Sequence, residues 1–501
     1  MKSLGFIKNV SIIIIYVLLA KFLSFLIELL FAIKFGANDQ TDAFFMAYGI
    51  IQVLYPIISI GIWKVFMPEY KTRIALGQHD EALSITNKLL FIFLLIVVLI
   101  SVLIILYPTL LIRVFAPGFN SVKMAECSIM LRILSIIFFF NTIATFCSVI
   151  LQANGCFGQS QLKEVVQHIP PVVFLFFFAY QYGINGVSLS IVFGAILSAT
   201  VAYYYTKKFY KICFPKTKLF DKETIKILKY VPIACLNAII NQINGIVDRA
   251  FSSILGVGTL TYLNYGSRLI HFFDSIFSSA ISTVLFPHIT ELVAKHEEEK
   301  LNILIRDSIM IISAFFIPIS FFILIYPYEL VGAVFGYGNF NISDVASTST
   351  VLMMYAIGLP AMGVTTVIND FFYVKKRASE LMVTTIICVV INAILDFILI
   401  GNLGVAGLAL ATSISYYLAL FMKLIMLKKD VKIDGILIKN IFLVIVLSFV
   451  AVLGCQLLGR YISVHKIIKL VVMLIIFGII YIITLLSVSN YYRNRVISIF
   501  K

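Results

Sequence analysis

The sequence contains few charged residues. Asp, Glu, Lys and Arg make up 13% of its 501 residues, hydrophobic residues make up 61%, and the mean hydropathy is +1.04. A soluble domain needs a charged, solvated surface and does not reach these values. Ile309–Tyr326 and Leu470–Val488 contain no charged residue, and at about 1.5 Å per residue each nearly crosses or crosses a hydrocarbon core of roughly 30 Å. The composition therefore predicts an all-α, polytopic membrane protein.

The sequence also lacks the patterns that hold metals, nucleotides or redox centres. Its seven cysteines are scattered singly without CxxC spacing, and no loop gathers His, Cys or carboxylates at metal-ligand spacing. No Gly-rich phosphate loop follows a strand, which excludes an ATP-binding engine in this chain. The predicted outer loops are short. We therefore expect a transporter rather than an enzyme, with no cofactor and no metal.

Positive charge is in excess and is unevenly placed. The sequence has 39 Lys and Arg against 24 Asp and Glu, a net charge of +15, and eight lysines fill residues 207–229. Basic residues follow every second apolar span, so the positive-inside rule places these loops and both termini in the cytoplasm and makes nucleic acid an unsuitable partner. The N-terminal apolar run continues past Lys21 to Ile33, which favours an uncleaved first span over a signal peptide. We expect a multi-pass membrane protein with both termini in the cytoplasm.

The apolar runs predict about fourteen transmembrane helices, with ends uncertain by two to four residues. Their ranges are 6–34, 42–67, 88–112, 127–152, 164–181, 185–206, 229–254, 261–286, 305–327, 346–373, 379–400, 403–426, 438–459 and 466–489.

The chain repeats itself. "FGANDQTDAFFMAYG" and "LYPTLLIRVFAPGFN" recur about 219 residues later as "LGVGTLTYLNYG" and "IYPYELVGAVFGYGNF". The repeat predicts an N-terminal six-helix lobe at 1–210, a basic linker at 211–228, a C-terminal six-helix lobe at 229–430 and two extra helices at 431–501. Lobes with an even number of spans share an orientation, the arrangement in which a central cavity serves alternating access.

Charged residues at membrane depth mark candidate functional positions, because each is costly there without a partner or a role. Lys21 lies about fifteen residues into the first span. It is either paired with Glu28 or a cation in a water-filled cavity. Arg268 stands on one helix side with His271 and Asp274, either in a self-satisfied string or facing the cavity, where its planar fork suits phosphate oxygens.

Other polar residues allow two interpretations. Lys64 can snorkel to the interface or face the cavity, and Asn241 shares a helix face with other amides that serve equally as interhelical contacts or ligands. Asp248 and Arg249 approach the outer interface, where we expect them to be solvated.

Asp42 begins the second helix, with Thr41 beside it as a candidate cap. The carboxylate either complements the dipole of its own helix or belongs to an outer gate. The predicted cavity is net cationic, which suits an anionic, lipid-linked phosphate more than a drug cation.

These motifs resemble the MurJ/MviN family of the multidrug/oligosaccharidyl-lipid/polysaccharide exporter superfamily. The resemblance is carried by "FGANDQTDAFFMAY", "VFAPGF", "LNYGSRL", the "LFP" that ends the eighth helix and "FGYGNF", and it covers nearly the whole chain. It implies a flippase that moves an undecaprenyl-diphosphate-linked saccharide, chiefly lipid II, to the outer leaflet, with the polyprenyl tail in a groove formed by the two extra helices.

The resemblance also implies site residues. Lys21 stands at the family's first helix-1 arginine, Asp42 at the Asp of Thr-Asp-Ala-Phe-Phe, and Arg268 at the helix-8 arginine. The chain departs from the family at Ile27, which stands at the second helix-1 arginine and precedes Glu28. It also departs where "YP" replaces an arginine pair at 55–56 and where "IGI" replaces Glu-Gly-Ala at 60–62. These departures leave a capsule or O-antigen unit open as the cargo beside lipid II.

The sequence thus predicts a monomeric flippase for a polyprenyl-diphosphate-linked saccharide within membrane lipid. Lys21, Arg268, Lys64 and Asn241 are its predicted substrate-binding residues, and Asp42 and Glu28 its predicted gating residues. The alternatives are a cation-coupled multidrug exporter of the same superfamily and a membrane glycosyltransferase or polymerase. The sequence does not identify a coupling ion.

Overall fold

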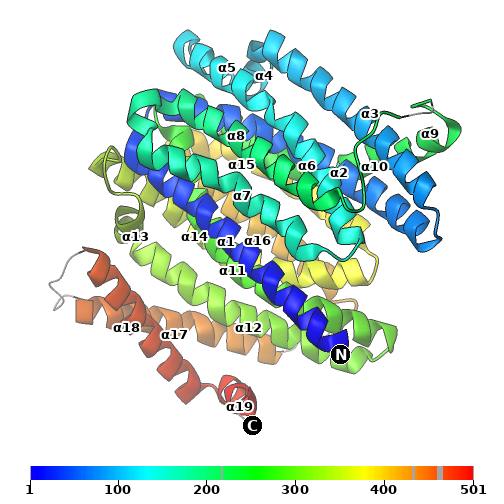
Figure 1. Cartoon of the computed structure of the whole chain (residues 1–501). Coiled ribbons are helices and arrows are strands. Elements are labelled where there is room, and N and C mark those ends of the chain that lie inside the picture. Colours follow the sequence, from blue (N-terminus) through cyan, green and yellow to red (C-terminus); the bar gives the residue numbers. More distant parts are fainter. Residues whose placement is uncertain (1, 216–217, 432–434, 460–465, 500–501) are drawn as a thin grey trace. The chain divides into compact units, whose positions relative to one another are not determined.

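The computed structural model describes residues 2–215, 218–431, 435–459 and 466–499 (Figure 1). Every regular element within these ranges is a helix, which confirms the all-α class. The chain forms two compact units, Met1–Thr261 with Gly338–Phe340, and Tyr262–Tyr337 with Asn341–Lys501. The lobe boundaries drawn from the sequence repeat remain a prediction.

The first unit contains ten helices and the first three residues of an eleventh. They are α1 (Lys2–Phe35), α2 (Asp39–Ala75), α3 (His79–Leu106), α4 (Pro108–Phe115), α5 (Ser121–Ser135), α6 (Ile137–Ala153), α7 (Phe157–Phe177), α8 (Ala179–Thr206), α9 (Lys222–Leu228), α10 (Val231–Ser252) and the start of α11 (Thr259–Ala294).

Packing in the first unit centres on α2 and α8. The helix α2 contacts α3, α5, α6 and α10, while α8 packs on α5, α6 and α7, and α1 runs along α7 (Figure 1). Aromatic rings join α1 to α2, since Phe31 stacks on Phe44 with ring centroids 4.6 Å apart and touches Phe45 at 5.2 Å. All three rings are buried. Their burial fixes the angle at which the chain turns from α1 into α2.

The second unit continues α11 and contains α12 (Glu298–Ile325), α13 (Pro327–Val334), α14 (Ile342–Val374), α15 (Ala378–Leu403), α16 (Val405–Leu427), α17 (Gly435–Gly459), α18 (Lys466–Val488) and α19 (Asn490–Ile499). In this unit α14 packs on α12 and α16, α15 on α16, and α17 on α12 and α18.

Eleven helical segments among the described residues are long and apolar enough to cross a membrane. The helices α7, α10 and α11 occupy the positions of the three other predicted spans. The structure is therefore consistent with fourteen spans. It divides two of the predicted helices and moves several ends. The range 88–112 is broken at Tyr107, where Pro108 starts the short helix α4, and 127–152 lies in the consecutive helices α5 and α6.

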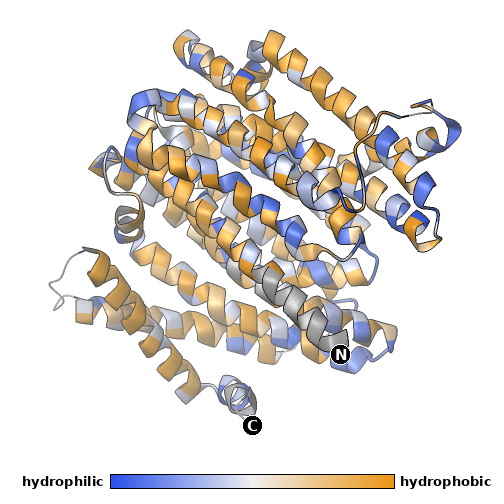
Figure 2. Ribbon diagram, in the orientation of Figure 1, coloured by the Kyte–Doolittle hydropathy of each residue, from blue (hydrophilic) through white to orange (hydrophobic). Residues whose placement is uncertain are grey.

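Hydropathy follows this arrangement. Hydrophobic residues cover most of α3, and hydrophilic residues gather at α9 and at the adjoining ends of α2 and α3 (Figure 2). Two ion pairs join these parts, Arg73 with Glu223 and Lys88 with Asp221. The basic linker is thus attached to the helix ends.

Candidate functional site

The start of α2 is fixed by Asn38. Its side-chain oxygen accepts hydrogen bonds from the backbone N–H groups of Gln40 and Thr41, each at 3.0 Å. The hydroxyl of Thr41 accepts in turn from the backbone N–H of Asn38 at 2.8 Å, which completes a capping box. The expectation that Thr41 is the cap was therefore wrong. Asn38 is the cap, because α2 begins three residues earlier than the apolar pattern indicated.

Asp42 lies one turn into α2 and is 1% exposed. Its carboxylate accepts hydrogen bonds from the backbone N–H of Gly258 at 2.7 Å and from the N–H and hydroxyl of Thr261 at 3.0 and 2.7 Å. The first N–H groups of a helix have no partner within the helix, and Gly258, which precedes α11, has no side chain to offer them. Asp42 therefore caps α11 from a distant part of the chain, where the positive end of the helix dipole favours a carboxylate.

Asp42 and Thr261 are 219 residues apart in the sequence, so their contact joins two distant segments of the first unit.

Lys123 completes the contact. Its side chain is 7% exposed, and its ammonium lies 2.7 Å from Asp39 Oδ1 and 3.3 Å from Asp42 Oδ2. It also donates to the backbone carbonyl of Gly256 at 3.4 Å. A buried carboxylate is costly unless it is paired and hydrogen-bonded, and Asp42 satisfies both conditions. We refer to Asp39, Asp42, Lys123, Gly258 and Thr261 as the Asp42 cluster.

Two glycines bring further backbone segments together at the same end of α1 and α2. The N–H of Gly118 donates to the hydroxyl of Ser253 at 3.1 Å, and a Cβ at Gly118 would lie 2.5 Å from the carbonyl oxygen of Ser253. Gly36, with φ +67°, lies where a Cβ would be 2.3 Å from the carbonyl oxygen of Asn339. The N–H of Asn339 donates to the carbonyl of Ile33 at 2.8 Å. The glycine-containing motifs around residues 36, 118, 256 and 338 thus meet at one end of the first unit.

A polar cavity of about 420 Å³ lies farther along α2. Side chains from α2, α6, α7, α8 and α10 line it, and its polar members are Tyr48, Gln52, Tyr55, Asn141, Gln167, Gln242 and Arg249. It offers amide, hydroxyl and guanidinium groups within membrane-spanning helices.

Arg249 is held against the backbone of α2. A Cβ at Gly49 would lie 2.4 Å from its Nε, so glycine alone leaves room for the guanidinium at this point. The guanidinium also donates to the carbonyl of Gly245 at 2.9 Å. Arg249 is half-buried and Asp248 is 8% exposed, so the expectation that this pair is solvated was wrong. The pair lies inside the bundle because α10 packs against α2 and α4 up to the end of α10.

Tyr55 is positioned by a second set of contacts in the same cavity. Its hydroxyl donates to the backbone carbonyl of Asn141 at 2.7 Å and lies 2.6 Å from the hydroxyl of Thr145. These contacts connect α2 to α6. The position at which the family resemblance expects an arginine therefore carries a fixed, uncharged side chain.

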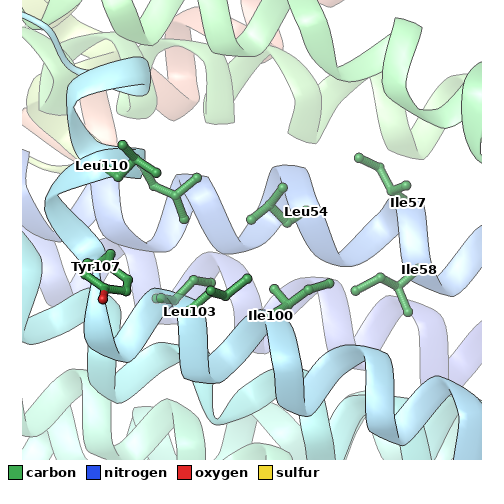
Figure 3. Close-up of a pocket in the computed structure, with 9 residues that line it drawn as sticks. Leu54, Ile57, Ile58, Ile100, Leu103, Tyr107 and Leu110 are labelled. Carbon is green, nitrogen blue, oxygen red and sulfur yellow. The ribbon is translucent and has the colours of Figure 1, made fainter.

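An apolar groove of about 370 Å³ lies between α2, α3 and α4 (Figure 3). Leu54 and Ile57 approach it from α2, Ile100 and Leu103 from α3, and Tyr107 from the junction between α3 and α4. Since the hydroxyl of Tyr107 is the one polar side-chain group in this lining, the groove suits a hydrocarbon chain and offers nothing to hold a diphosphate.

The predicted site residues occupy different surroundings. Lys21 is half-buried and Glu28 buried on α1, and Lys64 is exposed on α2. Arg268 is half-buried on α11 in the second unit. Asn241 is part of α10, but its side chain lies outside the described residues. Their roles as ligands stay predictions.

Three residues of these sites, Lys123, Thr261 and Arg249, were not predicted from the sequence. Lys123 carried a usable signal, because it is an isolated basic residue in a predicted outer loop that is otherwise nearly free of them. The signal for Arg249 was weaker: it was the glycine at position 49, which leaves room for the guanidinium. Thr261 carried none beyond its place in the repeat.

Comparison with known proteins agrees with this architecture. The family model described as "Lipid II flippase MurJ" matches residues 31–486. A protein of Buchnera aphidicola subsp. Schizaphis graminum described as "Probable lipid II flippase MurJ" is 27% identical over 504 residues, covering 96% of each chain. A protein of Aquifex aeolicus with the same description is 25% identical and covers 80% of this chain and 79% of its own.

Solved structures show the same fold. "Lipid II flippase MurJ, inward closed conformation" superimposes with a TM-score of 0.84 at 22% identity, over 97% of this chain and 99% of that one. An inward-facing multidrug resistance transporter of the MATE family has a TM-score of 0.70 at 15% identity, over 83% of this chain and 97% of its own. Because the family model spans most of the sequence, the chain belongs to the MurJ lipid II flippase family.

Proposed function

We propose that this chain moves a polyprenyl-diphosphate-linked saccharide from the inner to the outer leaflet of the cytoplasmic membrane by alternating access. The family model matched over residues 31–486 supports this function, as do relatives described as probable lipid II flippases. Lipid II is the first candidate cargo, and a capsule or O-antigen unit is the second. Both carry the same diphosphate.

The observation that carries the proposal is the arrangement along α2. The Asp42 cluster closes one end, and the polar cavity begins at Tyr48, six residues or about 9 Å of helix rise farther along. A head group released at that end must separate the groups that Asp42 holds together. The cluster consists of hydrogen bonds and an ion pair rather than interdigitated apolar side chains, so water can replace its contacts one by one when it opens.

The cargo would be bound by cations at membrane depth. We propose that Lys21 and Arg268 hold the diphosphate, with Lys64 and Asn241 as further ligands and Glu28 as a second gating residue. We add Arg249, whose guanidinium borders the polar cavity and presents the planar donor geometry that suits phosphate oxygens. The polyprenyl tail would remain in the bilayer beside α17 and α18.

The membrane potential could drive the step. A diphosphate carries roughly two negative charges, and an inside-negative potential supplies about 2.3 kcal/mol per charge per 100 mV for outward movement. This proposal includes both termini on the cytoplasmic side and a monomeric transporter. It requires that transport in vesicles respond to a potential set with valinomycin, and transport that is insensitive to that potential would exclude this driving force.

Depletion of the protein in its own cells tests the cargo. Accumulated lipid II and lysis are expected if the cargo is the cell-wall precursor, and loss of a surface polysaccharide with normal growth if it is another repeat unit. Normal levels of all polyprenyl-diphosphate-linked saccharides would refute the proposed function. Complementation with Arg249→Gln should fail. Arg132→Gln, which removes an exposed arginine of α5, should complement.

A cation-coupled drug exporter is the second candidate, because the MATE-family structures share the fold. A cationic drug would be repelled by Arg249 in the cavity wall. The two functions separate in one assay, since an exporter would change resistance to cationic drugs and leave the lipid-linked saccharides unchanged.

A further inference from the structure

We infer that the basic linker between α8 and α10 is a docking surface for the anionic phospholipid head groups of the adjacent leaflet. The surface comprises the linker and the residues that adjoin its two ends. Its members are Lys207, Lys208, Lys211, Lys218, Lys222, Lys226 and Lys229, together with the aromatic side chains of Phe214 and Phe220. All nine side chains are exposed. The inference concerns lipid around the protein and does not depend on the cargo.

The described residues of the linker, 211–215 and 218–228, contact the first unit at several points. Tyr210 is 2% exposed and donates its hydroxyl proton to the side-chain oxygen of Asn87, which also accepts from the N–H of Cys213 at 3.1 Å. Thr224 and Ile227 of α9 are buried as well. These contacts hold the linker against the end of α3, so its lysines keep their positions close to the membrane-spanning helices.

The only two carboxylates of residues 207–230 are already paired with buried cations of the helix ends. Asp221 pairs with Lys88, and Glu223 pairs with Arg73. The hydrogen bond from Lys88 lowers the pKa of Asp221 to about 2, so this carboxylate stays ionised and engaged at neutral pH. The lysines therefore have no acidic partner within their own segment. Their ammonium groups are therefore available to an anionic partner outside the segment.

Exposed aromatic rings distinguish this surface from a segment that serves only to set topology. Phe214 is 82% exposed and Phe220 57%, although Phe214 also contacts the ring of Phe91 on α3, with centroids 4.9 Å apart. The positive-inside rule accounts for lysines, but it gives no reason for phenylalanine in water. Aromatic residues interleaved with lysines are the composition that binds the interface of an anionic membrane.

The position of the segment supports a lipid partner over an acidic protein. Lys207 directly follows α8, and Lys229 lies two residues before α10, so both ends of the surface adjoin apolar helices. Lipid head groups are therefore within reach of the lysine side chains wherever those helices enter the bilayer. Basic residues immediately beside a membrane span attract anionic lipids, and each contributes roughly a fivefold gain in affinity.

The test uses the full chain in nanodiscs of phosphatidylcholine with a minor fraction of phosphatidylglycerol. A fluorophore on Cys213, the exposed cysteine next to Phe214, is quenched by lipids that carry a spin label on the head group. We expect labelled phosphatidylglycerol to quench at least about fivefold more than labelled phosphatidylcholine, the gain of a single lysine contact, and the difference to fall with added salt.

Matched variants distinguish the effect of the linker lysines from the effect of the total positive charge of the protein. Lys218, Lys222, Lys226 and Lys229 changed together to Gln should reduce the difference, because only Lys207, Lys208 and Lys211 of the surface then remain. The same four changed to Arg should keep the difference. The control changes Lys295, Lys300, Lys428 and Lys429 to Gln, which removes equal charge from other exposed lysines and should leave the quenching unchanged. Phe214 cannot be replaced beside the dye without altering the probe, so Phe220→Ala tests the aromatic contribution and should reduce the difference.

Equal quenching by both lipids in the unaltered protein would overturn the inference, and so would a difference that is as large in the Gln variant as in the unaltered protein. If replacing the lysines leaves the lipid preference unchanged, the lysines do not bind lipid, and an acidic protein would be the partner that fits their charge. A failure here leaves the proposed transport function untouched, because the assay contains no lipid-linked saccharide.

Discussion

Asp42→Asn should loosen the first turn of α11 while leaving α2 intact. The amide keeps one oxygen, which can still accept from the N–H and hydroxyl of Thr261. It places an NH₂ group against the N–H of Gly258 and the ammonium of Lys123, both of which are donors. The substitution thus removes one charge-assisted hydrogen bond and one partner of a buried ion pair.

The size of the effect follows from the group that loses its partner. Lys123 keeps its contact with Asp39, whereas the buried N–H of Gly258 loses its acceptor, and a buried donor left without a partner costs about 1–3 kcal/mol. Each 1.36 kcal/mol is a factor of about ten. The population in which the N–H groups of Gly258 and Thr261 are open should therefore rise by about one to two orders of magnitude, unless opening of a larger segment sets a lower limit.

Hydrogen–deuterium exchange of the peptide that covers residues 253–262 measures this opening. The control is Asp39→Asn, which removes the 43% exposed carboxylate that also pairs with Lys123. Its effect should stay below about 1 kcal/mol, the range of exposed ion pairs. Unchanged protection of Gly258 and Thr261 in Asp42→Asn, or equal effects of the two substitutions, would refute the capping of α11 by Asp42.

Three further outcomes are expected. Gly49→Ala should lower the free energy of unfolding by about 1–3 kcal/mol and displace Arg249, because the new methyl group would overlap the guanidinium. A thermal-shift assay measures the loss as a lower melting temperature. The matched control is Gly401→Ala on α15, where a Cβ would meet no atom within 4 Å. Thr261→Val should raise hydrogen–deuterium exchange at the start of α11 less than Asp42→Asn does, since the backbone N–H of residue 261 still donates. An equal or larger effect would contradict the view that Asp42 contributes more than the Thr261 hydroxyl to this helix start. The linker should stay docked from neutral pH down to about pH 4 and detach as the pH approaches 2. The pKa of Asp221 is lowered on folding from 3.8 to about 2, so its contribution is complete above the unfolded pKa and is lost as the folded carboxylate protonates. Fluorescence anisotropy of a dye on Cys213 reports this detachment, and detachment already at pH 6 would contradict the Lys88–Asp221 contact.

The sequence predicted the fold well because apolarity and charge asymmetry are properties of whole segments. Each span contains many apolar residues, so errors at single positions cancel. Breaks within spans were missed where the apolar run continues through them. At Tyr107 the following Pro108 was a visible signal, since proline has no N–H for the preceding turn and is favoured at the first position of a new helix.

The candidate site was harder to predict because its contacts join positions far apart in the sequence. Asp42 was recognised as a gating candidate, but its partner Thr261 is 219 residues away and is a common polar residue with no distinguishing pattern. Arg249 was assigned to solvent because its distance from the end of a predicted helix suggested an interface. The close approach of α10 to Gly49 depends on tertiary packing, which a single sequence does not reveal.

One short segment, Asn38 to Asp42, starts two helices at once. Asn38 caps α2, and four residues later Asp42 caps α11. Each residue turns an α-helix by about 100°, so a single insertion between the two positions would leave the first cap in place and rotate the second away from its target by more than a quarter turn. The number of residues from Asn38 to Asp42 therefore fixes the direction in which Asp42 points. An insertion or deletion here would remove the cap of α11 although the sequence of α11 itself had not changed.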